Sequence, residues 1–166
     1  MYTAMAEALP LKKRALRGRR LVLVDIENEI GGAVIDEAEA ALAQHAIDEA
    51  ICLAGCDQVV IGVSHIGVLP TYLGWPGCRI VVRSGPDGAD LALLEVLNKE
   101  RIAERFDEVV LASGDAIFAD AVAALGAAGV SVTVLTRIGS CSRQLRMAAG
   151  KTVYVDACAA RFGGVA

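Results

Sequence analysis

The sequence predicts a three-layer α/β/α sandwich built on a mostly parallel β-sheet. Apolar runs of strand length alternate with helical patterns along the chain. Hydrophobic residues make up 55% of the 166 residues, and Ala, Val and Leu supply most of them, as expected when helices cover both faces of a parallel sheet. The first run, Leu21-Val-Leu-Val24, is continuously apolar. A central parallel strand, which is buried on both faces, has this pattern.

Six strands and four main helices are expected in alternation. The strands are predicted over residues 20–25, 58–63, 79–82, 107–112 and 130–135, with a short sixth at 152–155. The helices are predicted over residues 36–53, 89–105 and 115–125, with a last one that ends near 149. Because strands and helices alternate, the connections should be right-handed crossovers between parallel strands.

Local signals indicate where several of these helices begin. Asp36 and Glu39 form an Asp-x-x-Glu capping pattern before the first long helix. Ser140 or Ser142 can cap the last helix. Two prolines within residues 64–77 restrict any helix between the second and third strands to a short one. These signals fit a single domain over residues 20–166, which follows a basic N-terminal extension over residues 1–19.

Charge is distributed unevenly along the chain, although the net charge is only −4. Residues 1–20 hold six Lys and Arg against one acid, a net +5, whereas the rest holds 10 basic and 19 acidic residues, a net −9. A basic arm of this kind can contact nucleic acid phosphates. It can equally be a solvated lead-in, which is common at chain termini. The sequence leaves both readings open.

The N-terminal residues do not resemble a signal peptide, because the basic cluster follows the apolar residues. A cytoplasmic location is therefore expected, with the five cysteines reduced. Cys52 and Cys56 form a pair with three residues between them, but no second pair or nearby His completes a zinc shell. Buried thiols are the preferred interpretation. No apolar run is long enough to span a membrane.

Three aspartates carry the strongest functional signal. Asp25, Asp90 and Asp115 each lie where a strand is predicted to end or the next helix to begin. In an open parallel sheet the carboxyl ends of the strands form the edge where ligands bind. Two like charges ~4 Å apart at an effective dielectric of ~20 repel by roughly 4 kcal/mol. A proton or a divalent cation can neutralise such a cluster, so the pattern favours a site for a hard metal ion.

Each aspartate also has a purely structural interpretation. Asp115 can act as a helix N-cap, and Asp90 falls in the first turn of a helix, where a carboxylate is favoured. Asp25 is harder to explain in this way, because it follows four apolar residues of a central strand and buried carboxylates are rare without a partner. Taken together, the three positions favour metal-assisted phosphodiester chemistry.

The order and spacing of these motifs resemble the NYN domains of the PIN-like nuclease superfamily. The resemblance covers about residues 20–157 and rests on short motifs in order: Asp25-Ile-Glu-Asn28, Gly88-Ala-Asp90-Leu91, Ser113-Gly-Asp115-x-x-Phe118, Leu125-Gly-x-x-Gly-Val130 and a Ser-rich start of the last helix. It implies a sheet of order 3-2-1-4-5 and metal-dependent cleavage of RNA with Mg²⁺ or Mn²⁺.

The resemblance also assigns roles to residues of this chain. Asp25, Asp90 and Asp115 are the expected metal ligands and catalytic residues, with Asn28 as a polar helper. One position departs from the family pattern, where Ser-Gly-Asp-x-Asp-Phe is common, because Ile117 replaces the second Asp. Asp120 lies about one helical turn further on and is not an equivalent ligand.

Substrate contacts are expected at the same edge of the sheet. Ser113 and Asn28 lie next to the predicted acidic site, and Arg137 follows the fifth strand. Arg143 and Arg146 are three residues apart on the last helix, so they share a face that can guide a phosphodiester backbone. The alternative for these arginines is a solvated helix face.

The sequence leaves two candidate functions for this protein. The first is a metal-dependent endoribonuclease that uses metal-activated water, with RNA as its partner and no membrane association. The second is a non-catalytic nucleic acid-binding or interaction module that keeps the fold with an incomplete acidic site. Retention of Asp25, Asp90 and Asp115 favours the first, and Ile117 favours the second. Whether the chain forms a homodimer is left open.

Overall fold

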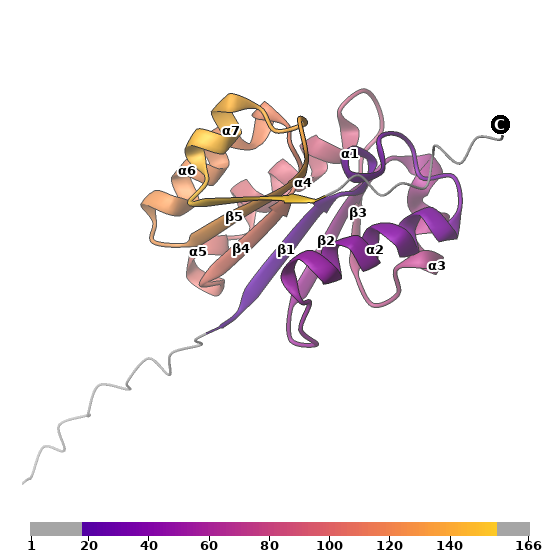
Figure 1. Ribbon diagram of the computed structural model, residues 1–166, viewed down its shortest axis with the longest axis horizontal. Helices are drawn as coiled ribbons and strands as arrows, with labels where there is room; N and C mark the ends of the chain where they lie inside the picture. The colour runs from indigo at the N-terminus through magenta and orange to yellow at the C-terminus, as the bar shows by residue number, and fades with distance from the viewer. Residues whose placement is uncertain (1–17, 156–166) are drawn as a thin grey trace, which may run out of the picture.

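A computed structural model describes residues 18–155, whose centre is a six-stranded, fully parallel sheet (Figure 1). The strand order is β3-β2-β1-β4-β5-β6. The strands are β1 (Arg20–Asp25), β2 (Gln58–Val63), β3 (Arg79–Val82), β4 (Glu108–Ala112), β5 (Ser131–Arg137) and β6 (Lys151–Val155). The order predicted for the first five strands and the short sixth strand are both confirmed. Residues 12–17, which carry much of the predicted basic arm, lie outside the described residues.

Helices cover both faces of the sheet, so the chain forms a three-layer α/β/α sandwich. One face is covered by α1 (Ile26–Ile30), α2 (Glu37–Ile51) and α3 (Val68–Gly74). The other is covered by α4 (Gly88–Lys99), α5 (Ile102–Arg105), α6 (Ala119–Ala127) and α7 (Arg143–Ala148). Two 3₁₀ turns, η1 (His65–Gly67) and η2 (Ala116–Phe118), precede α3 and α6. In the described part of the chain, no helix is long and apolar enough to cross a membrane.

The central strand β1 contributes to both hydrophobic cores. Leu21 and Leu23 pack with the layer that contains α4 and α6, whereas Val22 and Val24 pack with the layer that contains α2. This alternation follows from the two-residue period of a strand. Because β1 pairs with β2 on one side and β4 on the other, the strand order reverses here. The carboxyl ends of β1 and β4 therefore flank the crevice where ligands bind in open α/β sheets.

The helix boundaries differ from the sequence prediction in three places. The single helix predicted over 89–105 is wrong, because Arg101 adopts a left-handed conformation (φ 52°) that separates α4 from α5. The helix predicted from residue 115 begins instead as the 3₁₀ turn η2. The short helix α1 was not predicted, and it directly follows β1 where a polar loop was expected. The N-cap at Asp36 is confirmed, since its side chain accepts a hydrogen bond from the Glu39 N–H at 2.9 Å.

Arg20 and two cysteines near the amino edge of the sheet differ from what the sequence predicted. Arg20 was counted with the basic arm, but its Nε donates to Asp57 at 3.1 Å and its Nη1 donates to the Ile51 carbonyl at 3.2 Å. The expectation that Cys52 and Cys56 are buried is wrong, because both are exposed near the turn between α2 and β2. The four cysteines among the described residues are free thiols.

Gly62 allows α4 to lie close against the sheet beside Asp25. Gly62 is the residue of β2 that pairs with Asp25. A Cβ at this position would lie 2.6 Å from Leu93 Cγ and 2.8 Å from the Ala89 carbonyl oxygen, both in α4. Because a backbone oxygen cannot move aside cheaply, a larger residue would push the first turn of α4 away from β1 and β2.

We expect Gly62→Ala to lower the free energy of unfolding by about 1–3 kcal/mol, the usual cost of overpacking a core. Gly126→Ala is the matched control, since Gly126 lies in α6 with no atom within 4 Å of an added Cβ. This change should raise stability by up to about 1 kcal/mol through helix propensity. Urea unfolding measures both values. Equal effects of the two substitutions would contradict the close packing of α4.

Candidate functional site

Asp25 is the last residue of β1 and is held by neighbouring groups on two sides. Its carboxylate is only 4% exposed. Asp25 Oδ1 accepts a hydrogen bond from the Asn28 N–H at 3.2 Å, which caps α1. The Ser113 hydroxyl, at the end of β4, donates to Asp25 Oδ2 at 3.2 Å. Burial raises the pKa of Asp25, although these hydrogen bonds oppose the shift.

Asp90, in the first turn of α4, forms a carboxyl pair with Asp25. The side chains of the two residues share a hydrogen bond. Burial, the hydrogen bond to Asp25 and the negative charges of Asp25, Asp115 and Asp87 raise the pKa of Asp90 to about 8. Asp90 Oδ1 is buried and has no hydrogen-bond partner. At neutral pH Asp90 therefore retains its proton.

Asp115 lies at the same edge of the sheet but stands apart from this pair. Its side chain is exposed, and its Oδ1 accepts a hydrogen bond from the Ile117 N–H at 3.1 Å, so that Asp115 caps η2. Within residues 18–155, no group of three or more His, Cys, Asp or Glu side chains is arranged to hold a metal ion. The three aspartates thus form a pair of buried Asp25 and half-buried Asp90, and a third, exposed carboxylate.

Two pockets meet at Asn28. The first has a volume of about 200 Å³ and lies over the carboxyl pair. Its lining includes four carboxylate residues, Asp25, Glu27, Asp87 and Asp90. The second, of about 410 Å³, is lined by Asp115 and by residues 139–142. Asn28 lines both pockets, and its Oδ1 accepts a hydrogen bond from the Gly114 N–H at 3.3 Å. Asn28 therefore connects the end of β1 to the loop that follows β4.

Glu27 and Asp87 are the site residues whose placement the sequence did not indicate. Glu27 Oε1 accepts a hydrogen bond from the Ser64 N–H at 3.1 Å and another from the Ser64 hydroxyl. Glu27 is part of the Asp25-Ile-Glu-Asn28 motif, but because α1 was not predicted, the direction of the Glu27 side chain was unknown. Asp87 adopts a left-handed conformation (φ 56°) just before α4. Its position depends on the loop that precedes α4.

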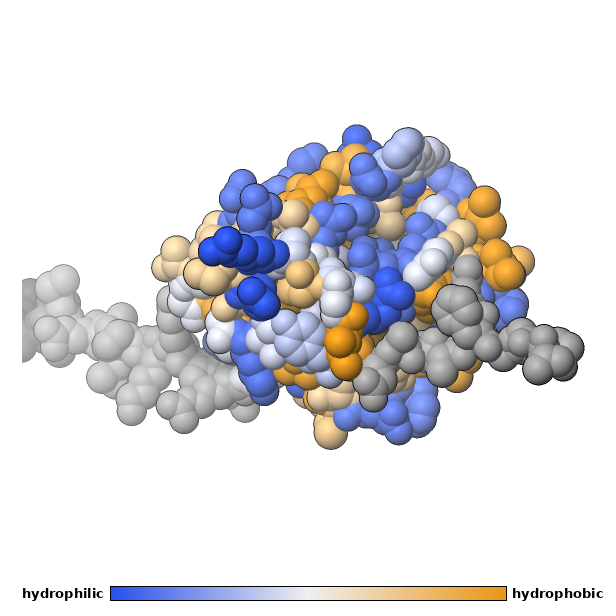
Figure 2. All heavy atoms as spheres, turned by 45° about the horizontal axis from the view of Figure 1, so that its top comes forward, coloured by the Kyte–Doolittle hydropathy of each residue, from blue (hydrophilic) through white to orange (hydrophobic). Residues whose placement is uncertain are grey.

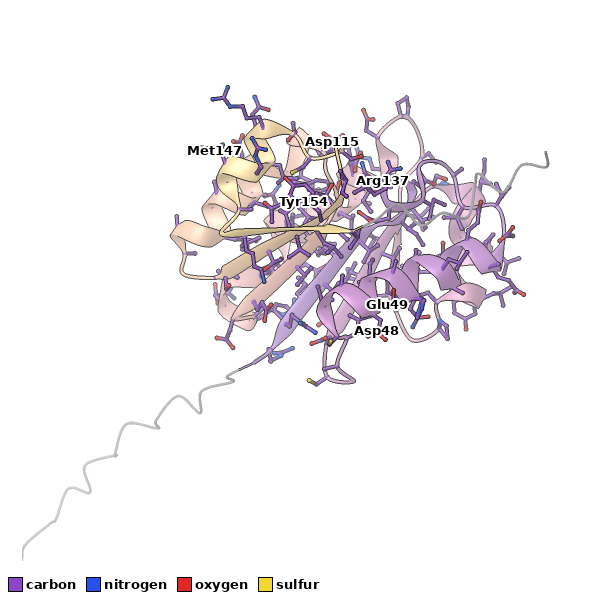
Figure 3. All side chains as sticks on the ribbon, viewed as in Figure 1. Asp48, Glu49, Asp115, Arg137, Met147 and Tyr154 are labelled. Carbon is purple, nitrogen blue, oxygen red and sulfur yellow. The ribbon has the colours of Figure 1, made fainter. Side chains whose placement is uncertain are left out.

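Arg137, which was expected to contact substrate, packs against the end of α1. Figure 3 places Arg137 and Asp115 at the same edge of the sheet. Arg137 is half-buried, and its Nη1 lies 3.1 Å from where a Cβ of Gly31 would be. Burial raises the pKa of the nearby Glu29 to about 7, and the charge of Arg137 opposes this shift. Arg137 is therefore placed to hold the end of α1, whereas Arg143, on α7, is exposed.

A different hollow, of about 340 Å³, lies near the turn between α2 and β2. Asp57 is part of its lining, but its carboxylate is already paired with Arg20. This hollow is less suited to bind a cation than the pocket over Asp25 and Asp90, because the Asp57 carboxylate already forms an ion pair with Arg20.

Comparison with known proteins supports the fold and gives no function. No family model matches the chain, and no curated protein matches it. Among solved structures, it is similar to a protein of unknown function from Vibrio parahaemolyticus, with a TM-score of 0.58 and 18% sequence identity. The match covers 84% of this chain and 94% of that one. At this identity the likeness concerns the architecture, a three-layer sandwich on a parallel sheet.

The raised pKa of Asp90 leads to a prediction about stability and pH. An unfolded Asp titrates near pH ~3.9, whereas Asp90 in the folded protein has a pKa of about 8. The folded state binds the extra proton between these values, so its stability falls as pH rises through this window. Because Asn does not titrate, the Asp90→Asn variant should not lose stability in this way. With divalent ions chelated, the stability of Asp90→Asn relative to wild type should rise by at least about 1 kcal/mol between pH 5 and pH 8.5.

Urea unfolding across this pH range tests the prediction. Glu29 titrates with the same sign, but it is present in both proteins, so the comparison with wild type cancels its contribution to first order. Asp120→Asn, at an exposed position of α6, is the control and should follow the wild-type profile. Parallel profiles for Asp90→Asn and wild type would exclude a shared proton in the pair.

Proposed function

We propose that this chain is a metal-dependent ribonuclease that cleaves RNA phosphodiester bonds at the pocket over Asp25 and Asp90. The observation that carries the proposal is the carboxyl pair of buried Asp25 and half-buried Asp90 at the crevice between β1 and β4, which retains a proton at neutral pH. A fold rarely keeps such a pair unless a proton or a cation compensates it. The resemblance of the motifs to NYN domains agrees with this function.

The residues of the pair fit Mg²⁺ or Mn²⁺. The side chains around this pocket that can bind a metal ion offer oxygen ligands, which these ions prefer, and no His or Cys lines it. Asp90 Oδ1 is buried without a partner, so one carboxylate oxygen is free to act as a ligand. Two carboxylates suffice, because Mg²⁺ usually keeps several waters and is held by one or two carboxylates together with substrate phosphate. When bound, the ion would activate a water and offset charge on the phosphate.

The charge of the pocket also favours a cation as an obligatory partner. Four carboxylate residues line it and no Lys or Arg does, so a phosphodiester would be repelled unless the negative charge were first reduced. Ser113 keeps Asp25 in position by donating a hydrogen bond to it. Asn28 offers an amide at the junction of the two pockets. Arg143, exposed on α7, is available to contact the RNA backbone.

A non-catalytic nucleic acid-binding module is the second candidate, and one observation favours it. Asp115 stands apart from the carboxyl pair, and Ile117 occupies the position where the family pattern has a further Asp. Ile117 is partly buried and packs against the hydrophobic core. With this arrangement the chain would bind RNA and leave it intact.

Cleavage of a labelled single-stranded RNA with Mn²⁺ or Mg²⁺ separates the two functions. We expect wild-type cleavage that chelation abolishes. Asp25→Asn and Asp90→Asn should each reduce the rate by at least about 100-fold, because each removes a negative charge from the ion's site. Asp115→Asn should have a smaller effect, since this carboxylate is outside the pair. Asp120→Asn is the control for an exposed acid of the same region and should retain full activity.

Binding of the same RNA, measured in parallel by fluorescence anisotropy, identifies the alternative. Binding without cleavage in either metal would support the non-catalytic module. Cleavage that Asp25→Asn and Asp90→Asn leave unchanged would place the reaction at another site or in a contaminant, and would overturn the proposal.

A further inference from the structure

Helix α3 packs against its own domain with its small residues. Gly67, directly before α3, lies against Val34, where an added Cβ would approach Val34 Cβ to 3.1 Å. At Gly74 an added Cβ would lie only 2.1 Å from the Glu37 carbonyl oxygen at the start of α2. Thr71, between these glycines, is fully buried. The side of α3 that faces the protein therefore has Thr71 between two glycines, together with the partly buried Val68.

The large apolar residues of this segment point outward. Ile66 is 71% exposed, Leu69 65%, Tyr72 64% and Leu73 54%. We call these four residues the α3 face. A surface helix normally buries its large apolar side chains and presents polar ones to water, so this helix has the reverse arrangement. Figure 2 shows hydrophobic atoms at the right-hand end of the molecule, where Figure 1 places α3.

The sequence around the α3 face has no charged side chain. Residues 58–78 contain no Asp, Glu, Lys or Arg, although such residues make up 22% of the chain. Exposed Ile35, just before α2, lies beside Val34, which Gly67 contacts. Ile35 is 67% exposed, so large apolar side chains from two segments are exposed in this region. Surfaces of this kind commonly mark contacts with another protein.

We infer that the α3 face is the interface of a homodimer in which two copies of this chain pack their α3 helices together. A two-fold interface brings the same patch of both copies together, so it must be compatible with itself. The four side chains of the α3 face are uncharged, so they place no like charges against each other across the axis.

The chemistry of the α3 face favours a second copy over nucleic acid. Phosphate contacts require Lys or Arg, and residues 58–78 have neither. Only one of the four side chains is aromatic, which gives little surface for base stacking. Large aliphatic residues with a Tyr are typical of the buried centre of protein interfaces. This inference is independent of the proposed ribonuclease activity, because it rests on residues outside the acidic pocket.

Sedimentation velocity of the full chain over about 1–100 µM tests the inference, a range that covers micromolar dissociation constants. We expect wild type to shift from monomer to dimer as concentration rises. Leu69→Lys should raise the dissociation constant at least tenfold, because it places two charges at the symmetric interface. Ile66→Lys is the second variant and should act in the same direction. Thermal unfolding of each variant shows that it remains folded.

Met147→Lys is the matched control, since Met147 is an apolar residue of α7 that is 75% exposed. It should dimerise like wild type. Wild type that remains monomeric at every concentration would overturn the inference, as would unchanged dimerisation of both α3 variants or equal loss in Met147→Lys. A monomer whose affinity for RNA falls in Leu69→Lys and Ile66→Lys would also overturn it and would assign the α3 face to nucleic acid.

Discussion

The carboxyl pair of Asp25 and Asp90 is the interaction on which the rest of the site depends. The pair joins the central strand β1 to the first turn of α4, two segments far apart in sequence. The absence of a Cβ at Gly62 allows α4 to approach closely enough for the pair to form. Burial raises the pKa of both carboxyls, and Asp90 retains its proton at neutral pH. This arrangement lowers stability as pH rises, and a bound cation would remove that penalty.

Neighbouring groups hold the pair and organise the surrounding pockets. Ser113 donates to Asp25 and also accepts a hydrogen bond from the Asp115 N–H at 3.3 Å. The end of β4 is thereby connected to the Asp25 carboxylate and to the backbone of Asp115. Asn28 receives the Gly114 N–H from the same loop. Arg137 supports α1 from β5. Because α1 begins at Asp25 and carries Asn28, the strands β1, β4 and β5 together determine the geometry of the site.

The sequence predicted the sheet and the buried position of Asp25, but not how the acidic groups are combined. Four apolar residues before Asp25 indicated a central strand that ends in a buried carboxylate, and the structure has this arrangement. The pairing of Asp25 with Asp90, and the separation of Asp115, depend on how closely α4 packs on Gly62. That is a tertiary contact with no local signal. The side-chain directions of Glu27 and Arg137 depend on α1, a five-residue helix too short for a clear periodic pattern.

Proton release on cation binding tests the central claim most directly. Titration calorimetry of Mn²⁺ at pH 7, repeated in buffers of different ionisation enthalpy, counts the protons released per ion. If Mn²⁺ displaces the proton held between Asp25 and Asp90, wild type should release close to one proton per ion. Asp90→Asn should release close to none. Mn²⁺ binding without proton release in wild type, or equal release in both proteins, would contradict the shared proton as the feature that defines this site.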